Sequence, residues 1–209
     1  MPKGTVSVAD ALHRKSALAD LAATLPAVSG QGIALQLLQP PVMISLRGFA
    51  NTALKDAVRS VCGCELPAAP NSSSVGPEGS ILKLGPDEWL LVGDAGTSWS
   101  EKMVLSGATL TDVSHARIVI KVDGDQSREM LAKGCAIDLH PQQFPAGTCV
   151  QSSIAKINVI LHRPRNDNGF MLYSARSYAG SFWYWLTAAA KEYGYHAVTP
   201  PISSNNLHR

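Results

Sequence analysis

Short runs in which apolar and polar residues alternate predict most of the strands of this chain. The run 117–124, RIVIKVDG, places Ile118, Ile120 and Val122 on one face of a strand and charged residues on the other. The turn sequence GPDE at 85–88 separates two apolar runs, which predicts a hairpin. The strands expected on these grounds are 33–38, 42–46, the two arms of 81–93, 117–124, 148–162 and 169–175.

Apolar residues at helical spacing predict four helices, at 8–25, 52–63, 126–135 and 181–194. The segment 67–79 is rich in proline, serine and glycine and is expected to be a loop. In the last helix Ser181 is the expected N-cap, and Gly194 is expected just beyond the C-terminus. One stripe of this helix is expected to face the core: Phe182, Trp185, Leu186, Ala189 and Tyr193.

The order strand, glycine, helix, loop, strand, turn, strand occurs twice along the chain, with Gly48 and Gly124 in matching places. This order predicts an α+β fold of two related lobes, each a small mixed or antiparallel sheet with packed helices. The expected organisation is an N-terminal helical segment at 1–32, a first lobe at 33–105, a second lobe at 106–199 and a tail at 200–209.

Two large aromatic residues of the last helix lie off its expected core stripe. Tyr184 falls nearly opposite the stripe and Trp183 lies on its flank. Because Trp and Tyr are enriched at the anchors of protein interfaces, this face predicts a partner surface, which also carries Lys191. The alternative is that a neighbouring loop or the N-terminal helix covers both aromatic residues. Arg176 is a further interface candidate, since its guanidinium can pair with a carboxylate in this chain or in a partner.

The composition favours a globular protein that does not bind nucleic acid. Hydrophobic residues make up 45% of the chain and charged residues 16%, which is enough apolar material for a core. The formal net charge is +2, and no basic groove with interleaved aromatic residues is present in the sequence. No run approaches the roughly 20 apolar residues that span a bilayer, and no secretory signal is recognisable. We therefore expect a soluble, cytoplasmic protein without a membrane partner.

Two groups of reactive residues are candidates for chemistry, and neither has the spacing that its chemistry needs. On a strand, the neighbours Ser114 and His115 point apart, so they cannot act with Asp112 as a nucleophile, base and acid. If this segment is a turn instead, Asp112 and Ser114 cap backbone N–H groups. The CGC motif at 62–64 is tighter than paired zinc ligands usually are. Without a Rossmann, P-loop or metal-ligand motif, the residues predict no catalytic, cofactor-binding or metal site.

Several longer motifs resemble one protein family. The segment DVSHARIVIKVDG is similar to a DVSH segment of the folate-binding aminomethyltransferase superfamily. The runs LAKGCAIDLHPQQFPAGTCVQSSIAKINVILH and RSYAGSFWYWLTAAAKEYG resemble the gamma subunit of heterotetrameric sarcosine oxidase. The shorter motifs HRKSALADLA and LGPDEWLLVG fit the same family, so that the resemblance covers most of the chain in order.

This resemblance implies a specific fold and role. The expected fold is aminomethyltransferase-like, and the expected role is that of a non-catalytic accessory subunit in a cytoplasmic flavoenzyme complex. Such a complex oxidatively demethylates sarcosine or a related N-methyl amino acid. The chain would pack chiefly against the alpha subunit, together with beta and delta subunits, and would itself hold no cofactor, while FAD, FMN, NAD and tetrahydrofolate belong to the other subunits. The alternatives are a free-standing folate-binding protein or aminomethyltransferase and, less compatible with the residues, a small hydrolase.

Overall fold

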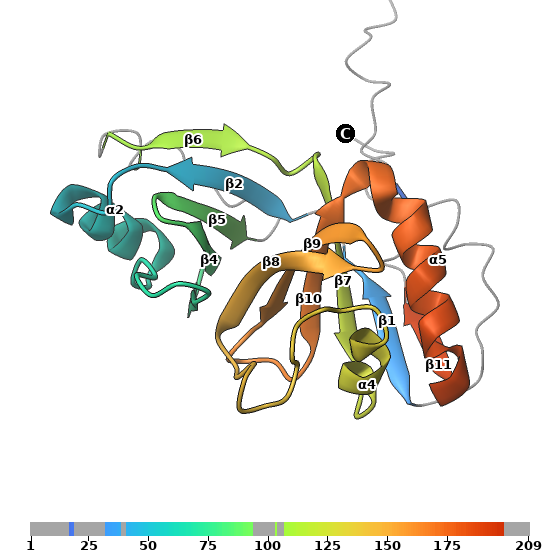
Figure 1. Ribbon diagram of the computed structural model, residues 1–209. Helices are drawn as coiled ribbons and strands as arrows, with labels where there is room; N and C mark the ends of the chain where they lie inside the picture. Colours follow the sequence, from blue (N-terminus) through green and yellow to red (C-terminus); the bar gives the residue numbers. More distant parts are fainter. Residues whose placement is uncertain (1–16, 19–31, 39–40, 94–102, 104–106, 199–209) are drawn as a thin grey trace, which may run out of the picture.

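The computed structural model describes residues 17–18, 32–38, 41–93, 103 and 107–198. These residues form two lobes, each built on one β-sheet, that lie side by side (Figure 1). The predicted helix at 8–25 lies outside the described residues apart from 17–18, and the predicted tail at 200–209 lies wholly outside them. No helix in the described part of the chain is both long and apolar enough to cross a membrane.

The first lobe is a five-stranded antiparallel sheet with a helix packed on one face. Its strands lie in the order β3-β4-β5-β2-β6. Their bounds are β2 Val42–Arg47, β3 Ser73–Gly76, β4 Gly79–Gly85, β5 Glu88–Gly93 and β6 Thr109–Asp112. The helix is α2, Thr52–Cys62, and Asn51 accepts a hydrogen bond from the Leu54 N–H at 2.9 Å at its start. Gly63, with a φ of 66°, ends the helix in the left-handed conformation that glycine favours.

The second lobe is a mixed six-stranded sheet, in the order β11-β1-β7-β10-β9-β8. Its strands are β1 Ile33–Leu37, β7 Arg117–Asp123, β8 Thr148–Ile154, β9 Ile157–Arg163, β10 Phe170–Ala175 and β11 Tyr195–Val198. Only β1 and β11 pair in parallel; the other described pairs are antiparallel. Two helices, α4 Ser127–Ala132 and α5 Ala179–Ala190, pack on this sheet, and 3₁₀ turns η2 Arg176–Tyr178 and η3 Lys191–Tyr193 flank α5. The predicted α+β class with two lobes is confirmed.

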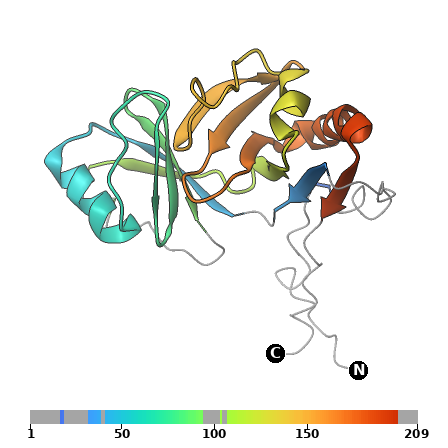
Figure 2. The same cartoon turned by 90° about the horizontal axis from the view of Figure 1, so that it is seen from below.

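The described elements stack in four layers, with the helices outside and the two sheets facing each other (Figure 2). Alternating residues of each strand divide between the layers. On β5, for example, Trp89 and Leu91 pack toward α2, whereas Leu90 packs toward the second lobe. On β7, Ile118 and Ile120 pack toward α4 and α5. A separate apolar cluster of both lobes therefore joins the two sheets.

The predicted repeat is present as a repeat of topology. The order β2, Gly48, α2, β3, β4, β5 in the first lobe matches β7, Gly124, α4, β8, β9, β10 in the second. The sheet order β3-β4-β5-β2 matches β8-β9-β10-β7. Each half of the chain thus contributes the same four-stranded unit, although the two halves share little sequence.

The strand that precedes each unit lies in the other lobe. β1 pairs with β7 of the second lobe, and β6 pairs with β2 of the first. The Leu38 N–H donates to the Val119 carbonyl at 3.0 Å, and the Val113 N–H donates to the Met43 carbonyl at 2.8 Å. The predicted ranges 33–105 and 106–199 therefore do not coincide with the two sheets.

Several predicted elements differ from the structure in detail. The expected loop at 67–79 contains β3, an edge strand whose partner β4 supplies its ladder hydrogen bonds, so it forms despite weak strand propensity. β6 and β11 were not predicted, because each is short and has little apolar alternation. The last helix begins at Ala179 and not after Ser181, and it ends at Ala190. Gly194, with a φ of 68°, instead ends the 3₁₀ turn that follows.

Candidate functional site

The segment from Asp112 to Ala116 is a turn that crosses between the lobes. The Ala116 N–H donates to the Val113 carbonyl at 3.0 Å, and the Ser114 N–H donates to Asp112 Oδ1 at 2.8 Å. Ser114 Oγ accepts from the Met43 N–H at 2.8 Å and is buried, whereas His115 is exposed. The expectation that Asp112 and Ser114 cap backbone groups in a turn is confirmed. A hydroxyl engaged in this way is not placed for nucleophilic attack.

The space between the two sheets is filled by apolar side chains from both lobes. The cluster consists of Met43, Leu82, Leu90, Val119, Cys149, Ile160 and Tyr173, each no more than 1% exposed. Burial of Tyr173 raises the pKa of its phenol above the usual range, so the side chain is neutral at physiological pH.

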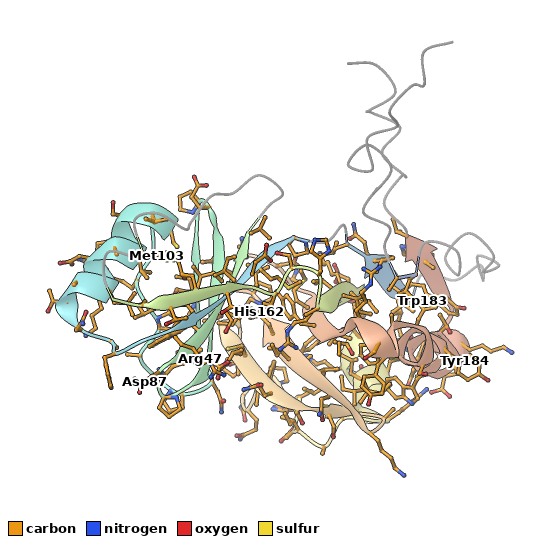
Figure 3. All side chains as sticks on the ribbon, turned by 90° about the horizontal axis from the view of Figure 1, so that it is seen from above. Arg47, Asp87, Met103, His162, Trp183 and Tyr184 are labelled. Atoms are coloured by element: carbon orange, nitrogen blue, oxygen red, sulfur yellow. The ribbon has the colours of Figure 1, made fainter. Side chains whose placement is uncertain are left out.

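His162 is the buried titratable group at the edge of this cluster, and Figure 3 shows it in the middle of the molecule. Its Nε2 lies 3.0 Å from Ser73 Oγ, and Ser73 Oγ donates to the Gly147 carbonyl at 3.0 Å. Because the serine proton is used in that bond, Nε2 carries the imidazole proton and donates to Ser73. Nδ1 has no hydrogen-bond partner among the described residues. Burial lowers the pKa of His162 to about 4, so the ring is neutral at physiological pH.

The four described cysteines are free thiols, and burial raises the pKa of Cys62, Cys64 and Cys149. Cys149 Sγ donates to the Ser72 carbonyl at 3.2 Å, and burial raises its pKa to about 11. Burial also raises the pKa of Cys62 to about 12 and raises that of Cys64. The thiolate is the nucleophile and the metal ligand, so these residues are poorly suited to either role. Among the described residues, no group of three or more His, Cys, Asp or Glu is placed to hold a metal ion.

The predicted interface residues of the last helix do not all reach the surface. Trp183 is 1% exposed and packs in the core of the second lobe, so the expectation that it lies on a free surface is wrong. Tyr184 is 76% exposed and points outward from α5 (Figure 3). The core face of α5 is turned by about one residue from the expected stripe; it comprises Ala179, Phe182, Trp183, Leu186, Thr187 and Ala190. The helix is apolar around most of its circumference, so its sequence does not select which side is buried.

Lys191 and Arg176 lie at the two ends of α5. Lys191 is exposed at the C-terminal end, and Arg176 is exposed in η2, where its backbone N–H donates to the Ala116 carbonyl at 2.9 Å. Tyr184 and Lys191 are seven residues apart, which places them on the same outer side of the helix. A subunit contact through Tyr184, Lys191 and Arg176 stays a prediction.

A polar groove that the sequence did not reveal lies on the second sheet near the first lobe. It has a volume of about 570 Å³ and is lined by Arg117, Gln151, Ser152, Ser153, Asn158, Val159 and Ile160. Arg117 lies on β7, far along the chain from the β8–β9 hairpin that supplies the other lining residues, and the sheet order brings them together. The alternation in 117–124 places Arg117 on the polar face of its strand, and this is the one indication of the groove in the sequence.

Comparison with known proteins gives consistent results. The profile of the Sarcosine oxidase, gamma subunit family matches residues 47–192. The sarcosine oxidase subunit gamma of Corynebacterium sp. (strain U-96) is 28% identical over 190 residues, covering 86% of this chain and 91% of that protein. Both comparisons agree with the resemblance found in the sequence motifs.

Two solved structures share the fold. A chain of the heterotetrameric sarcosine oxidase from Corynebacterium sp. U-96, in complex with pyrrole 2-carboxylate, matches with a TM-score of 0.78 and 27% identity. That match covers 87% of this chain and 96% of the other. The glycine cleavage system aminomethyltransferase T from Bartonella henselae matches with a TM-score of 0.60 and 12% identity, over 81% of this chain and 48% of that one. The second likeness concerns the fold alone, and it confirms the expected aminomethyltransferase-like architecture.

Proposed function

This chain belongs to the sarcosine oxidase gamma subunit family, and we propose that it is an accessory, non-catalytic subunit of a heterotetrameric complex. In this proposal the complex oxidatively demethylates sarcosine or a related N-methyl amino acid. The chain packs chiefly against the large alpha subunit and stabilises it, and beta and delta subunits complete the assembly.

The observation that carries this proposal is the extent of the structural likeness. The match to a chain of a heterotetrameric sarcosine oxidase covers 96% of that chain with a TM-score of 0.78. Both lobes therefore have counterparts in a protein that works within an assembly. A chain that keeps the whole architecture of such a subunit is suited to the same kind of assembly.

The non-catalytic part of the proposal is supported by the roles of the reactive side chains described above. Ser114 Oγ bonds to the Met43 backbone, and His162 Nε2 bonds to Ser73. Cys149 is buried, with a pKa raised to about 11. Ser73 Oγ lies within hydrogen-bond distance of His162 Nε2, but its proton is used in the bond to the Gly147 carbonyl and both side chains are buried. These bonds hold strands of the two lobes in place, which supports a structural role for the groups.

FAD, FMN, NAD and tetrahydrofolate are assigned in this proposal to the other subunits. A flavin or pterin ring needs a slot between apolar or aromatic walls. The space between the two sheets, where such a slot would lie in the described part, is filled by Met43, Leu90, Tyr173 and their neighbours. This packing supports the assignment of the ring-shaped cofactors to the other subunits.

A pull-down of the tagged full-length chain from its native host tests the proposal. Intact-mass measurement and an absorbance scan of the eluate are expected to show three further chains and a flavin spectrum. A colourless, well-folded monomer would contradict the subunit assignment. In that case a titration with tetrahydrofolate would test the alternative of a free-standing folate-binding protein.

A further inference from the structure

The side chain of Arg117 lines the polar groove defined above. Arg117 pairs with Ala175 of β10, and two residues further along β7 Val119 pairs with Tyr173. Side chains two apart on a strand share a face, so Arg117 points to the side of the sheet that faces the first lobe. The short side chain of Ala175 leaves room beside it. Ser153 and Asn158, which pair across β8 and β9, contribute polar groups to the same groove.

Arg117 is half-buried and carries a charge that no described residue neutralises. No hydrogen bond or ion pair of its side chain is formed with the described residues. Glu88 lies near enough to favour the charged form, but its Oε1 pairs with Arg47 Nη2 at 3.0 Å. Burial acts in the opposite direction and lowers the pKa of Arg117. A half-buried, unpaired cation is costly for a folded chain, and the cost is relieved when a carboxylate binds.

The lining of the groove shows which kind of ligand fits. Five of its seven lining residues are polar or charged, whereas small-molecule pockets are mostly apolar and enclose most of the ligand. A volume of about 570 Å³ is larger than a single small carboxylate requires. Gln151 Nε2 donates a hydrogen bond to the Leu84 carbonyl at 2.9 Å, so this side chain links the two lobes and its amide N–H is used in that bond. Ser153 and Asn158 remain beside Arg117 on a strand pair that includes β8, the edge of the sheet.

We propose that this groove binds an acidic side chain of another subunit, whose carboxylate pairs in a bidentate manner with Arg117 while Ser153 and Asn158 contact its backbone. The planar guanidinium fork matches a carboxylate, which a lysine ammonium does not. The identity of the partner as another subunit rests on the proposed function. The polar groove, and an Arg117 side chain that no described residue pairs with, do not depend on it.

Substitutions at Arg117 test the charge pairing in the tagged full-length chain, expressed with the other subunits. R117Q is expected to weaken retention of the partner about tenfold or more, since it leaves a partly desolvated carboxylate unpaired. R117E is expected to abolish retention, and R117K to keep a part of it. Lys55 is an exposed lysine of α2 in the other lobe, and K55Q is the matched control. It is expected to retain the partner as the wild type does. The melting temperature of the isolated R117Q chain should not fall, because no partner within the described residues is lost.

A photo-crosslinker identifies the occupant directly. With p-benzoylphenylalanine in place of Asn158, the crosslinked peptide is expected to come from another subunit and to contain Asp or Glu. Unchanged retention by R117Q and R117E, or crosslinks only to this chain, would overturn the inference. Thermal stabilisation of the isolated wild-type chain by sodium acetate that is lost in R117Q would support the pairing of Arg117 with a carboxylate. If the wild type and K55Q both retain no partner, the proposed function fails instead.

Discussion

Ser114 Oγ accepts a hydrogen bond from the Met43 N–H at 2.8 Å across 71 residues of chain, at the point where the lobes exchange strands. The same hydroxyl lies 3.3 Å from the Met43 carbonyl, to which it donates. Next to it, the Val113 N–H donates to the same carbonyl at 2.8 Å. Ser114 thus binds both polar groups of one buried backbone position and stabilises the crossing.

Replacing Ser114 by alanine is expected to lower the free energy of unfolding by about 1–3 kcal/mol. The loss follows because the buried Met43 N–H is left without a partner. Urea unfolding followed by circular dichroism measures the difference. Ser60→Ala, an exposed serine of α2, is the control and should cause no loss, since alanine is the better helix former. An equal stability of Ser114→Ala and the wild type would show that water or a relaxed backbone satisfies this N–H.

The stability of the chain is expected to depend on pH through His162. Its pKa is lowered from the ordinary 6.5 to about 4 by burial, so protons bind the unfolded state more readily than the folded one. The contribution of neutral His162 to the free energy of unfolding is therefore complete above pH 6.5. It is lost as the pH falls toward 4, by about 3 kcal/mol in total. Unfolding free energies of the wild type and His162→Gln, measured at several pH values, should converge over this interval as the pH falls. Parallel curves would show that His162 titrates normally.

The matching glycines Gly48 and Gly124 are expected to differ in their tolerance of a side chain. Gly124 has a φ of 113°, and a Cβ there would overlap the Gly32 carbonyl oxygen. At Gly48 the nearest atoms to a Cβ are those of Ala108 at 3.2 Å, and its backbone conformation is open to other residues. Gly124→Ala should therefore cost at least about 2 kcal/mol, and Gly48→Ala clearly less. Thermal unfolding of both variants measures the difference, and a larger loss at Gly48 would contradict the assignment.

The hairpin between β8 and β9 is expected to gain stability from a glycine. Its two turn residues, Ala155 and Lys156, have φ values of 50° and 67°, as in a type I′ turn, which favours Asn and Gly. Lys156→Gly removes a left-handed strain of about 1 kcal/mol and should raise the unfolding free energy by a similar amount. Lys156→Ala, which removes the same charge but keeps the strain, is the matched control. If both variants change stability equally, the effect belongs to the charge.

Of the two neighbouring aromatic residues of α5, Trp183 is expected to affect the stability of the chain, and Tyr184 its binding to other subunits. Trp183→Ala should lower the unfolding free energy by about 3–5 kcal/mol, since it empties a fully buried site. Tyr184→Ala should change stability by no more than about 0.5 kcal/mol, because the side chain is 76% exposed. It should nevertheless reduce retention of other subunits in a pull-down. Full retention by Tyr184→Ala would remove α5 from the predicted interface.

Much of the local structure followed from the sequence. The alternation in 117–124 located β7, the GPDE turn located the β4–β5 hairpin, and the spacing in 52–63 located α2 with Gly63 at its end. In each case the residues that decide the conformation are neighbours along the chain. For Asp112–Ser114 the sequence left a strand and a turn as two open alternatives. The turn depends on few local contacts, among them the bond from the Ser114 N–H to Asp112 Oδ1.

The larger arrangement depended on contacts between distant parts of the chain. The exchange of β1 and β6 between the lobes, the buried side of α5 and the edge strand β3 depend on which surfaces meet. An apolar helix such as α5 has no single stripe, and the sheet beneath it selected Trp183 over Trp185 for full burial. The groove at Arg117 combines β7 with the β8–β9 hairpin through the sheet order. The sequence by itself determined the strands, turns and helices whose deciding residues are neighbours, such as β7, the β4–β5 hairpin and α2. Only the tertiary structure decided which strands pair and which charge the described residues leave without a partner, because those depend on burial shared by residues far apart.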